Sequence, residues 1–490
     1  MRTALILLFL LAVAAAPGSY LPQRGVDPGK VTAYFQQHKE LAPILDRLSL
    51  FDVYSAPWFA AIYLLLFISL AGCVIPRLGQ HTRALRARPP AAPRNLGRLP
   101  YHATFTVTDA PADVLAAARA TLRGYRADGT ETTVAAEKGY ARETGNLLFH
   151  FALLALLLAV GAGAAFGYRG NVLLNEGSGF ANTVAAYDRY IPGSLVGAGD
   201  LQPFSAHLED FAATYVTEGR TRGQASSFTA KLRYRESPES PERPYDLRVN
   251  HPLEVDGARL YLLGHGYAPV FKVTDGNGEV PWDGPVPFLP RDQITYTSEG
   301  VVKAPDAGPD QLAFLGYFFP TSGKTADGKL TSTFPAPDDP TVTLLSFKGD
   351  LGLDAGVPQS VYAIEAKGLT KIGKSTTLRP GETLELPDGA GSITFTGYRE
   401  WASLQITSDP GRTWALVAAV LAIAGLLPAL TVRRRRVWVR ARAGDGGRTV
   451  VEVGGLTKAD GDGFAPEFDE ITEGLRARLR AAPPSVGDKE

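Results

Sequence analysis

The chain has 490 residues, in which 50 lysines and arginines balance 50 aspartates and glutamates, and hydrophobic residues make up 45%. The neutral charge balance gives no sign of nucleic-acid binding, so we expect no nucleic-acid partner. A single cysteine, Cys73, excludes an internal disulfide framework and any CxxC redox motif within the chain.

Four apolar stretches without a charged residue occupy residues 3–21, 56–76, 146–167 and 414–432. Each approaches the roughly 20 apolar residues that a helix needs to cross about 30 Å of hydrocarbon. We therefore predict a membrane protein with four transmembrane α-helices and a large β-rich extracytoplasmic domain between the third and fourth spans. A cleavable signal peptide is the alternative for the first stretch, because Met1 and Arg2 precede an apolar run that ends in three alanines.

The predicted division of the chain follows these spans. It comprises a first span at 1–22, an extracytoplasmic loop at 23–55, a second span at 56–76, a cytoplasmic loop at 77–145, a third span at 146–167, the β-rich domain at 168–411, a fourth span at 412–432 and a cytoplasmic tail at 433–490.

Arginines set the predicted orientation. Residues 77–98 contain six arginines and no acidic residue, and residues 433–442 contain six more arginines. Enrichment of lysine and arginine next to span ends marks the cytoplasmic side. We therefore expect a multi-pass protein of the plasma membrane with both termini in the cytoplasm. The arginines are interpreted as topology anchors in preference to contacts with a partner or with lipid head groups.

Local patterns predict the elements of the polar parts. In the cytoplasmic parts, we expect strands at 101–108, 132–136 and 450–453, helices at 110–122 and 464–479, and disorder after Pro483. In the outer part, strands are expected at 227–236, 245–250, 259–263, 270–273 and 341–347. Turns with glycine or proline separate them, as at 275–278 and 387–389. The outer part is therefore predicted to be a β-sandwich or an irregular β-domain.

No enzyme motif is present. The chain lacks HExxH, GxSxG and GxxxxGK[ST], so zinc hydrolysis, serine-esterase chemistry and ATP hydrolysis have no visible residues to perform them. We name no catalytic residue and expect no catalytic activity from the chain alone.

Six histidines outside the spans give weak signals. His251 and His265 fall in neighbouring predicted strands, and two histidines are able to bind a metal ion or haem, although histidines on a β surface are usually ordinary polar side chains. His207 is a weaker candidate than these two. The other three lie in predicted polar loops without a partner motif: His38, His81 and His102.

His150 differs from these because it lies inside the third apolar stretch, four residues after Asn146. Ionisable residues within a span are rare, face the protein interior and are functional by default. Neutral imidazole is a common axial ligand of haem iron. The alternative is a histidine that hydrogen-bonds to a neighbouring helix. The third span runs outward, so His150 is expected near the cytoplasmic face.

Several stretches of the chain, in this order, resemble the ResB or CcsB family of cytochrome c biogenesis proteins, which belong to the bacterial and plastid system II pathway. The matching stretches are 5–24 with its PGSYLPQ end, 70–77 (LAGCVIPR), 143–154 (ETGNLLFHFALL), 170–180 (GNVLLNEGSGF), 249–269 (VNHPLEVDGARLYLLGHGYAP) and 408–440, which runs from SDPGRTWALV to RRRRVWVR. No single motif is unique, but their order around four spans makes the combination specific.

The resemblance implies a subunit of a haem-attachment (cytochrome c synthetase) complex. It implies a second membrane protein of the CcsA or ResC type, with which the chain moves haem from the cytoplasmic side and presents it to apocytochrome c outside. His150 matches the family's histidine in the third span, the proposed haem ligand. The tryptophan-rich haem motif and the external histidines belong to the partner, so the family pattern gives no ligand role to His251 or His265.

Two other functions in the same pathway stay open. In the first alternative, the chain is a membrane scaffold that never touches haem. In the second, it is a component that keeps the apocytochrome thiols reduced, with Cys73 as the candidate thiol and a thioredoxin-like thiol reductant as a partner. Haem is expected to be bound transiently and shared with the partner.

Overall fold

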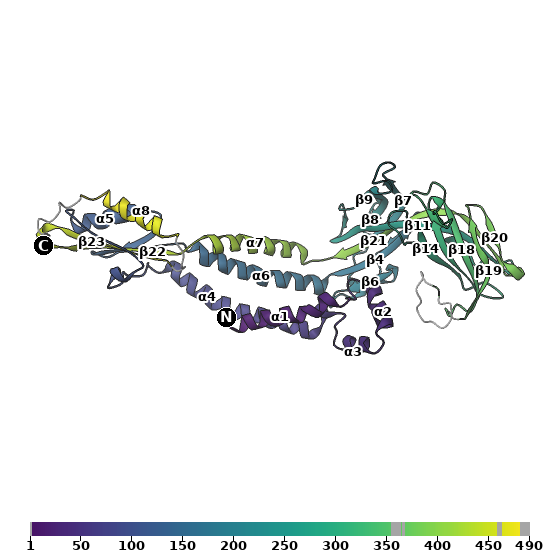
Figure 1. The fold of residues 1–490 in the computed structure, drawn as a ribbon, viewed down its shortest axis with the longest axis horizontal. Helices are drawn as coiled ribbons and strands as arrows, with labels where there is room; N and C mark the ends of the chain where they lie inside the picture. Colours follow the sequence, from purple (N-terminus) through teal and green to yellow (C-terminus); the bar gives the residue numbers. More distant parts are fainter. Residues whose placement is uncertain (1, 354–363, 365–367, 458–462, 481–490) are drawn as a thin grey trace. The chain divides into compact units, whose positions relative to one another are not determined.

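The computed structural model describes residues 2–353, 364, 368–457 and 463–480 (Figure 1). The chain forms two compact units, one made of Met1–Ala159 with Thr413–Glu490 and the other of Val160–Arg412. The segment after Pro483, predicted to be disordered, lies outside the described residues.

Within the described ranges, three helices are long and apolar enough to cross a membrane: α4 (Pro57–Arg86), α6 (Ala141–Phe166) and α7 (Arg412–Thr431). The helix α1 (Arg2–Tyr20) is also apolar, but its apolar part is shorter than these three. It packs along α4 in the first unit. The helix α4 continues through Pro76, where the second span was predicted to end, as far as Arg86.

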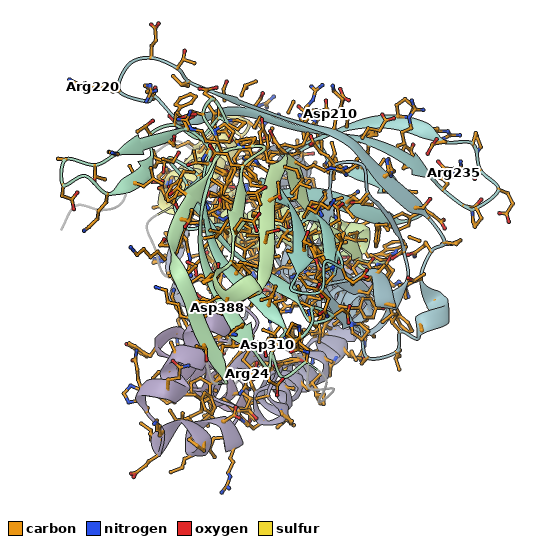
Figure 2. The ribbon with its side chains drawn as sticks, turned by 90° about the vertical axis from the view of Figure 1, so that its right-hand side faces the viewer. Arg24, Asp210, Arg220, Arg235, Asp310 and Asp388 are labelled. Carbon is orange, nitrogen blue, oxygen red and sulfur yellow. The ribbon has the colours of Figure 1, made fainter. Side chains whose placement is uncertain are left out.

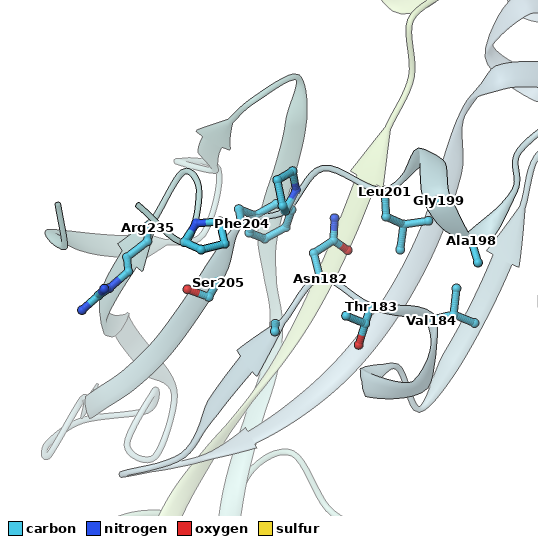
Figure 3. Close-up of a pocket in the computed structure, with 12 residues that line it drawn as sticks. Asn182, Thr183, Val184, Ala198, Gly199, Leu201, Phe204, Ser205 and Arg235 are labelled. Carbon is cyan, nitrogen blue, oxygen red and sulfur yellow. The ribbon is translucent and has the colours of Figure 1, made fainter. Parts of the chain in front are cut away.

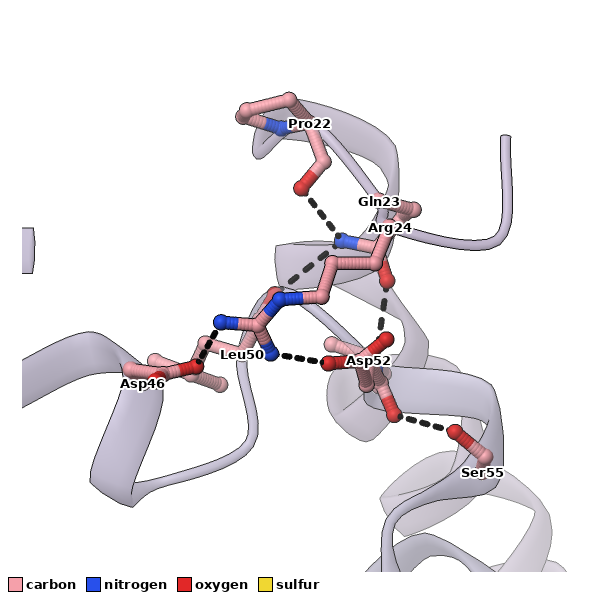
Figure 4. Close-up of polar contacts among 8 residues, drawn as sticks. Pro22, Gln23, Arg24, Asp46, Leu50, Asp52 and Ser55 are labelled. Atoms are coloured by element: carbon pink, nitrogen blue, oxygen red, sulfur yellow. Dashed lines mark hydrogen bonds and ion pairs between the residues drawn. The ribbon is translucent and has the colours of Figure 1, made fainter. Parts of the chain in front are cut away.

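Between α1 and α4 lies a small folded segment, residues 21–56, which holds α2 (Pro28–Gln37), α3 (Leu41–Arg47) and the 3₁₀ turn η1 (Val53–Ser55). Arg24 joins its ends by donating to Asp46 at 2.6 Å and to Asp52 at 2.5 Å (Figure 4). The Arg24 side chain is partly exposed, so each ion pair contributes about 0–1 kcal/mol.

The neighbouring Gln23 is buried and makes the tighter connection. Its Nε2 donates to the carbonyl of Leu50 at 3.0 Å (Figure 4). Its Oε1 accepts from the amide of Val53, also at 3.0 Å. A buried amide that lost these partners would cost about 1–3 kcal/mol. Gln23 and Arg24 therefore hold the beginning of this segment against its end.

A terminal α+β domain completes the first unit. Its antiparallel sheet has the order β1-β23-β22-β3-β2. The strands are β1 (Tyr101–Val107), β2 (Arg126–Gly129), β3 (Thr133–Lys138), β22 (Arg435–Ala443) and β23 (Thr449–Thr457). Two helices, α5 (Pro111–Thr121) and α8 (Ala465–Arg476), pack on one face through Val114, Phe468 and Leu475. Trp438 and the 3₁₀ turn η2 (Leu96–Arg98) pack on the other face.

The strands and helices predicted in this domain are confirmed, but two strands were not predicted. The strand β22 pairs with both β3 and β23, so the loop before α6 and the tail after α7 form one sheet. The Val437-Trp438-Val439 sequence after the arginine run favours this strand. The other unpredicted strand is the short β2.

The arginine run has carboxylate partners inside this domain. Glu137 on β3 is buried and accepts from Arg434 at 2.6 Å and from Arg436 at 2.8 Å. Burial opposes ionisation of Glu137, but hydrogen bonds from these two arginines and from Tyr140 outweigh it, so its pKa is lowered. Arg435 forms an ion pair with Glu467 on α8. These arginines therefore stabilise the domain, a role that their sequence position did not indicate.

The second unit is a β-rich domain, whose described residues form four sheets. One sheet has the order β10-β11-β21-β4-β6, with β12 and β20 at its sides; the others have the orders β5-β7-β8-β9, β13-β14-β15-β18-β19 and β16-β17. Their strands are β4 (Tyr168–Asn175), β5 (Gly179–Ala181), β6 (Arg189–Pro192), β7 (Ser205–Tyr215), β8 (Ala225–Arg235), β9 (Arg243–Arg248), β10 (Leu253–Val255), β11 (Ala258–Asp275), β12 (Trp282–Pro285), β13 (Leu289–Pro290), β14 (Ser298–Ala304), β15 (Leu312–Phe319), β16 (Ser322–Lys324), β17 (Leu330–Ser332), β18 (Thr341–Gly349), β19 (Leu369–Leu378), β20 (Thr383–Glu385) and β21 (Gly391–Ser408). The 3₁₀ turns are η3 (Val184–Ala186), η4 (Ala198–Asp200) and η5 (Pro387–Gly389).

The long strands β11 and β21 pair along their whole length and join two hydrophobic cores. Leu260 and Ile406, in one half of the pair, pack against the sheet of β7 and β8. Phe271 and Phe395, in the other half, pack against the sheet of β14, β15 and β18. The predicted sandwich is thus two sandwiches that share one strand pair. The surface of β7 and β8 carries charges such as Asp210 and Arg235 (Figure 2).

Most strand predictions in this domain are confirmed, and one boundary is wrong. Residues 259–263 and 270–273 were predicted as separate strands, whereas β11 runs through both. The intervening Gly264-His265-Gly266 resembles a turn in sequence, yet the pairing with β21 continues there after a β-bulge between Leu262 and Gly264. Glycines inside a strand often mark a bulge or the close approach of another group. Here a Cβ on Gly266 would collide with the Trp401 indole.

Candidate functional site

His150 lies in the third turn of α6, half-buried, and its Nδ1 atom is 2.6 Å from the carbonyl oxygen of Asn146. A carbonyl oxygen only accepts hydrogen bonds, so Nδ1 carries a proton. In the neutral tautomer with this proton, the lone pair is on Nε2. Metal-binding histidines usually donate their other ring N–H in this way, because the bond fixes the tautomer and the ring orientation.

Close contact between α6 and α7 determines which way His150 points. A Cβ on Gly145 would lie 2.5 Å from the carbonyl oxygen of Gly425, and one on Gly425 would lie 2.6 Å from the amide nitrogen of Phe149. Small residues allow two membrane helices to approach this closely. At 3.6 residues per turn, His150 is about 140° round the helix from Gly145. Its ring therefore leaves α6 on a side turned away from α7.

A third helix holds the first turns of α6 on another side. The Nε2 atom of His81 on α4 lies 2.9 Å from Oγ1 of Thr144, and His81 is buried. The prediction that His81 lies in a polar loop is wrong, because α4 continues to Arg86. Residues 77–88 contain Gly79 but no proline, and proline is the residue that would stop the helix in this stretch. The same prediction is wrong for His102, which lies on β1. Thr144 is about 120° round α6 from His150.

The His150 ring is therefore hydrogen-bonded to its own helix and only half-buried. α7 packs at Gly145, and α4 contacts Thr144, but His150 faces neither contact. Among the described residues, the only hydrogen bond of the His150 ring is the one to Asn146. In this arrangement Nε2 of His150 is suited to serve as the one ligand nitrogen that this chain supplies.

His265, a weaker candidate in the sequence, is buried in the β-rich domain at the midpoint of β11. Aromatic rings stack on its two faces, with centroids 4.9 Å away for Phe211 and 4.6 Å for Tyr296. Its Nε2 lies 3.3 Å from the Tyr215 hydroxyl. The rings leave no open face for a flat ligand such as haem. His265 is therefore built into the core where the two sandwiches meet.

Glu400 on β21 faces His265 inside this aromatic cluster. Its Oε2 atom is 3.9 Å from Nδ1 of His265, and neither atom has a hydrogen-bond partner among the described residues. Burial raises the pKa of Glu400 to about 8, helped by the nearby carboxylates of Glu176 and Asp210. Burial also lowers the pKa of His265 to about 4. The pair therefore carries no charge near neutral pH, with the proton on Glu400.

The other two candidates do not join a cluster. His251 is exposed and forms an isolated bridge with Arg248, so the structure does not bring it together with the buried His265. Cys73 is exposed on α4 and is a free thiol. No group of three or more histidine, cysteine, aspartate or glutamate side chains in the described part of the chain is arranged to hold a metal ion.

A pocket of about 790 Å³ opens on the β-rich domain between η3, η4 and the adjoining ends of β7 and β8 (Figure 3). Arg235 is the only ionisable residue in its lining. The buried amide of Asn182 already donates to Tyr168 at 2.9 Å and to the carbonyl of Gln202 at 2.8 Å. The pocket therefore has space for a ligand and one positive charge, but its lining holds no group suited to acid–base catalysis or metal binding.

Comparison with known proteins places the chain in a family. The model of the ResB-like family matches residues 1–469. The cytochrome c biogenesis protein CcsB of Synechococcus sp. (strain CC9902) is 26% identical over 483 residues, which cover 96% of this chain and 95% of the relative. The protein of the same name from Paulinella chromatophora is 23% identical over 490 residues, which cover 96% of both chains.

A shorter match has the same name. The CcsB protein of Thermosynechococcus vestitus (strain NIES-2133 / IAM M-273 / BP-1) is 26% identical over 286 residues, which cover 55% of this chain and 59% of the relative. With nearly the whole sequence matched by the family model, this chain belongs to the ResB-like family.

Proposed function

We propose that this chain acts in cytochrome c biogenesis, as one subunit of a membrane complex that moves haem from the cytoplasmic side and presents it for covalent attachment to apocytochrome c outside. The names of the relatives, each a cytochrome c biogenesis protein, support the pathway. The observation that supports the haem step is the hydrogen bond from Nδ1 of His150 to Asn146.

In this proposal, His150 binds haem iron through Nε2. The backbone carbonyl of Asn146 holds the ring in the required tautomer, so the lone pair is available without a proton transfer. Haem iron takes two axial ligands, and α4 and α7 are already engaged on other sides of α6. The second ligand therefore comes from a partner, a membrane protein of the CcsA or ResC type. Haem is cargo here, and no catalytic residue is assigned to this chain.

The proposed topology has four spans, with α1 as the first, both termini in the cytoplasm and the β-rich domain outside. The arginines that follow α4 and α7 support this orientation. His150 is nine residues after the start of α6, which is about 14 Å along the helix axis. Haem bound there would lie near the cytoplasmic leaflet, where a molecule arriving from the cytoplasm is first received.

The haem proposal is tested on the purified two-subunit complex. His150→Ala should lower the haem content, change the axial-ligand absorption spectrum and abolish c-type cytochrome formation, while the two subunits still copurify. Added imidazole should partly restore function, because it fits the space of the lost ring. His102→Ala is the matched control, since His102 is exposed on β1.

A complex of the His150→Ala variant with the haem content and spectrum of the wild type would contradict the ligand role. His150 would then be a packing residue, and the scaffold function would be favoured. The orientation is tested separately with reporter fusions. Fusions near Arg88 and Gly444 should report the cytoplasm, and a fusion near Gly300 should report the outside. An external signal at Gly444 would contradict the four-span topology.

A further inference from the structure

A loop of the β-rich domain is attached to the end of a membrane helix. Three backbone amides donate to carbonyls of the last turn of α6 and the residue after it: Gly193 to Gly167 at 2.8 Å, Ser194 to Ala164 at 3.3 Å, and Leu195 to Ala165 at 2.9 Å. The last carbonyls of a helix have no partner within the helix. A Cβ on Gly193 would lie 2.5 Å from the Gly167 oxygen, so the approach depends on glycine. The loop is therefore fixed at the boundary of the span.

This loop exposes aliphatic side chains at that boundary. Leu195 is 63% exposed, and Ile191 at the end of β6 is also exposed. Phe166, the last residue of α6, is exposed beside the residues to which the loop is bound. Isolated apolar side chains on a soluble surface need no explanation. These are different because hydrogen bonds fix them at the level where an apolar helix ends.

A second surface of the same kind occurs in the other unit. Leu41, Ile44 and Leu48 lie along one face of α3 and its C-terminal residue, and all three are exposed, Ile44 by 56%. Residues spaced by three and four share a face of a helix. The indole N–H of Trp58, in the first turn of α4, donates to the carbonyl of Leu48 at 3.0 Å. This apolar face is therefore also fixed at the end of a membrane helix.

We propose that both surfaces rest in the interface of the outer leaflet, where their side chains contact lipid acyl chains next to the head groups. The proposal uses the orientation argued above but not the haem step. Short amphipathic segments lie in this zone with their apolar face toward the acyl chains. Lipid is favoured over a protein partner because two surfaces from separate units share one property, a hydrogen-bonded attachment to a span end.

The test uses a fluorescent label on single cysteines in full-length protein reconstituted in phosphatidylcholine vesicles. Leu195→Cys and Ile44→Cys are made in a Cys73→Ser background. Leu158→Cys, at a position 73% exposed within α6, is the control for contact with lipid. Ile294→Cys, at a position 66% exposed just before β14, is the control for contact with water. Quenching is measured with nitroxide lipids present in both leaflets and with aqueous iodide.

We expect labels at 195 and 44 to be quenched by nitroxide lipid as at 158 and to be protected from iodide relative to 294. Iodide quenching at 195 and 44 equal to that at 294 would overturn the proposal. If addition of the partner subunit then protected both positions, they would belong to a protein interface instead. Because nitroxide is in both leaflets, a wrong orientation would not change the result, and failure of the haem proposal would leave it untouched.

Discussion

Gly145 on α6 and Gly425 on α7 face each other so closely that neither position has space for a Cβ atom. The contact places the Gly425 backbone against α6 from Gly145, five residues before His150, to the amide of Phe149, the residue next to His150. It therefore fixes the rotation of α6 about its axis, and with it the direction of the proposed haem ligand.

Gly425→Val should destabilise the pairing of α6 and α7 by about 1–3 kcal/mol, the usual cost of overpacking a filled interface. The measurement is the thermal midpoint of the detergent-solubilised protein, together with the haem content of the complex. Gly161→Val on α6 is the control, because nothing lies within 4 Å of a Cβ at that position. An equal loss in both variants would mean that the glycine contact has no special role.

Removal of the Glu137 carboxylate should loosen the terminal α+β domain. Glu137→Ala leaves the guanidinium groups of Arg434 and Arg436 without their shared partner. Breaking a buried ion pair costs about 3–5 kcal/mol, and the partial exposure of Arg436 places the expected loss at the lower end. The expected result is faster proteolysis within β3 and β22.

The control for that variant is Glu131→Ala, since Glu131 is exposed in the same domain. A second variant combines Arg434→Met, Arg436→Met and Glu137→Leu. It should recover most of the stability, because no charge is then left unpaired. Proteolysis of Glu137→Ala at the wild-type rate would show that the cluster contributes little.

The stability of the β-rich domain should fall as the pH rises from about 6.5 to 8. Folded Glu400 keeps its proton up to a pKa of about 8, whereas the unfolded chain releases it near 4.5, so stability is lost above 4.5. His265, with a folded pKa of about 4 against 6.5 unfolded, has the opposite effect between these values. Between pH 4.5 and 6.5 the two effects on the free energy of unfolding cancel. Above pH 6.5 only the effect of Glu400 remains, a loss of about 1.4 kcal/mol per pH unit.

Glu400→Gln should abolish this loss, because the amide does not titrate. The measurement is the midpoint of the thermal transition of the β signal by circular dichroism at several pH values. Glu254→Gln is the control, since Glu254 is exposed on β10. A wild-type midpoint that stays constant from pH 6.5 to 8 would show that Glu400 is already ionised in the folded domain.

Cys73→Ser should retain c-type cytochrome assembly at the wild-type level. Cys73 lies within α4, toward the arginine-rich end in the proposed topology, and the apocytochrome thiols are presented about 30 Å away across the bilayer. The measurement is haem staining of c-type cytochromes in cells that carry the variant. Loss of assembly that an external reductant restores would favour the thiol-reduction function.

The sequence by itself determined the features that depend on local composition. Uninterrupted apolar runs predict α4, α6 and α7, because a helix in lipid must satisfy its backbone internally and cover itself with apolar side chains. Alternation and turn residues predict β1, β8 and β18 for the same local reason. His150 was identified as a candidate because an ionisable side chain in an apolar run is conspicuous without knowledge of the fold.

Only the tertiary structure decided the features that depend on contacts between distant residues. The strand β22 lies between β3 and β23 because it pairs with both. Its partner β3 comes about 300 residues earlier in the chain, so no local pattern predicts this pairing. Neither the engagement of Arg434 with Glu137 nor the burial of His265 opposite Glu400 is encoded in a local pattern. The direction in which His150 points was likewise decided by the packing of Gly145 on Gly425, since rotation of a helix is fixed by its neighbours and not by its own hydropathy.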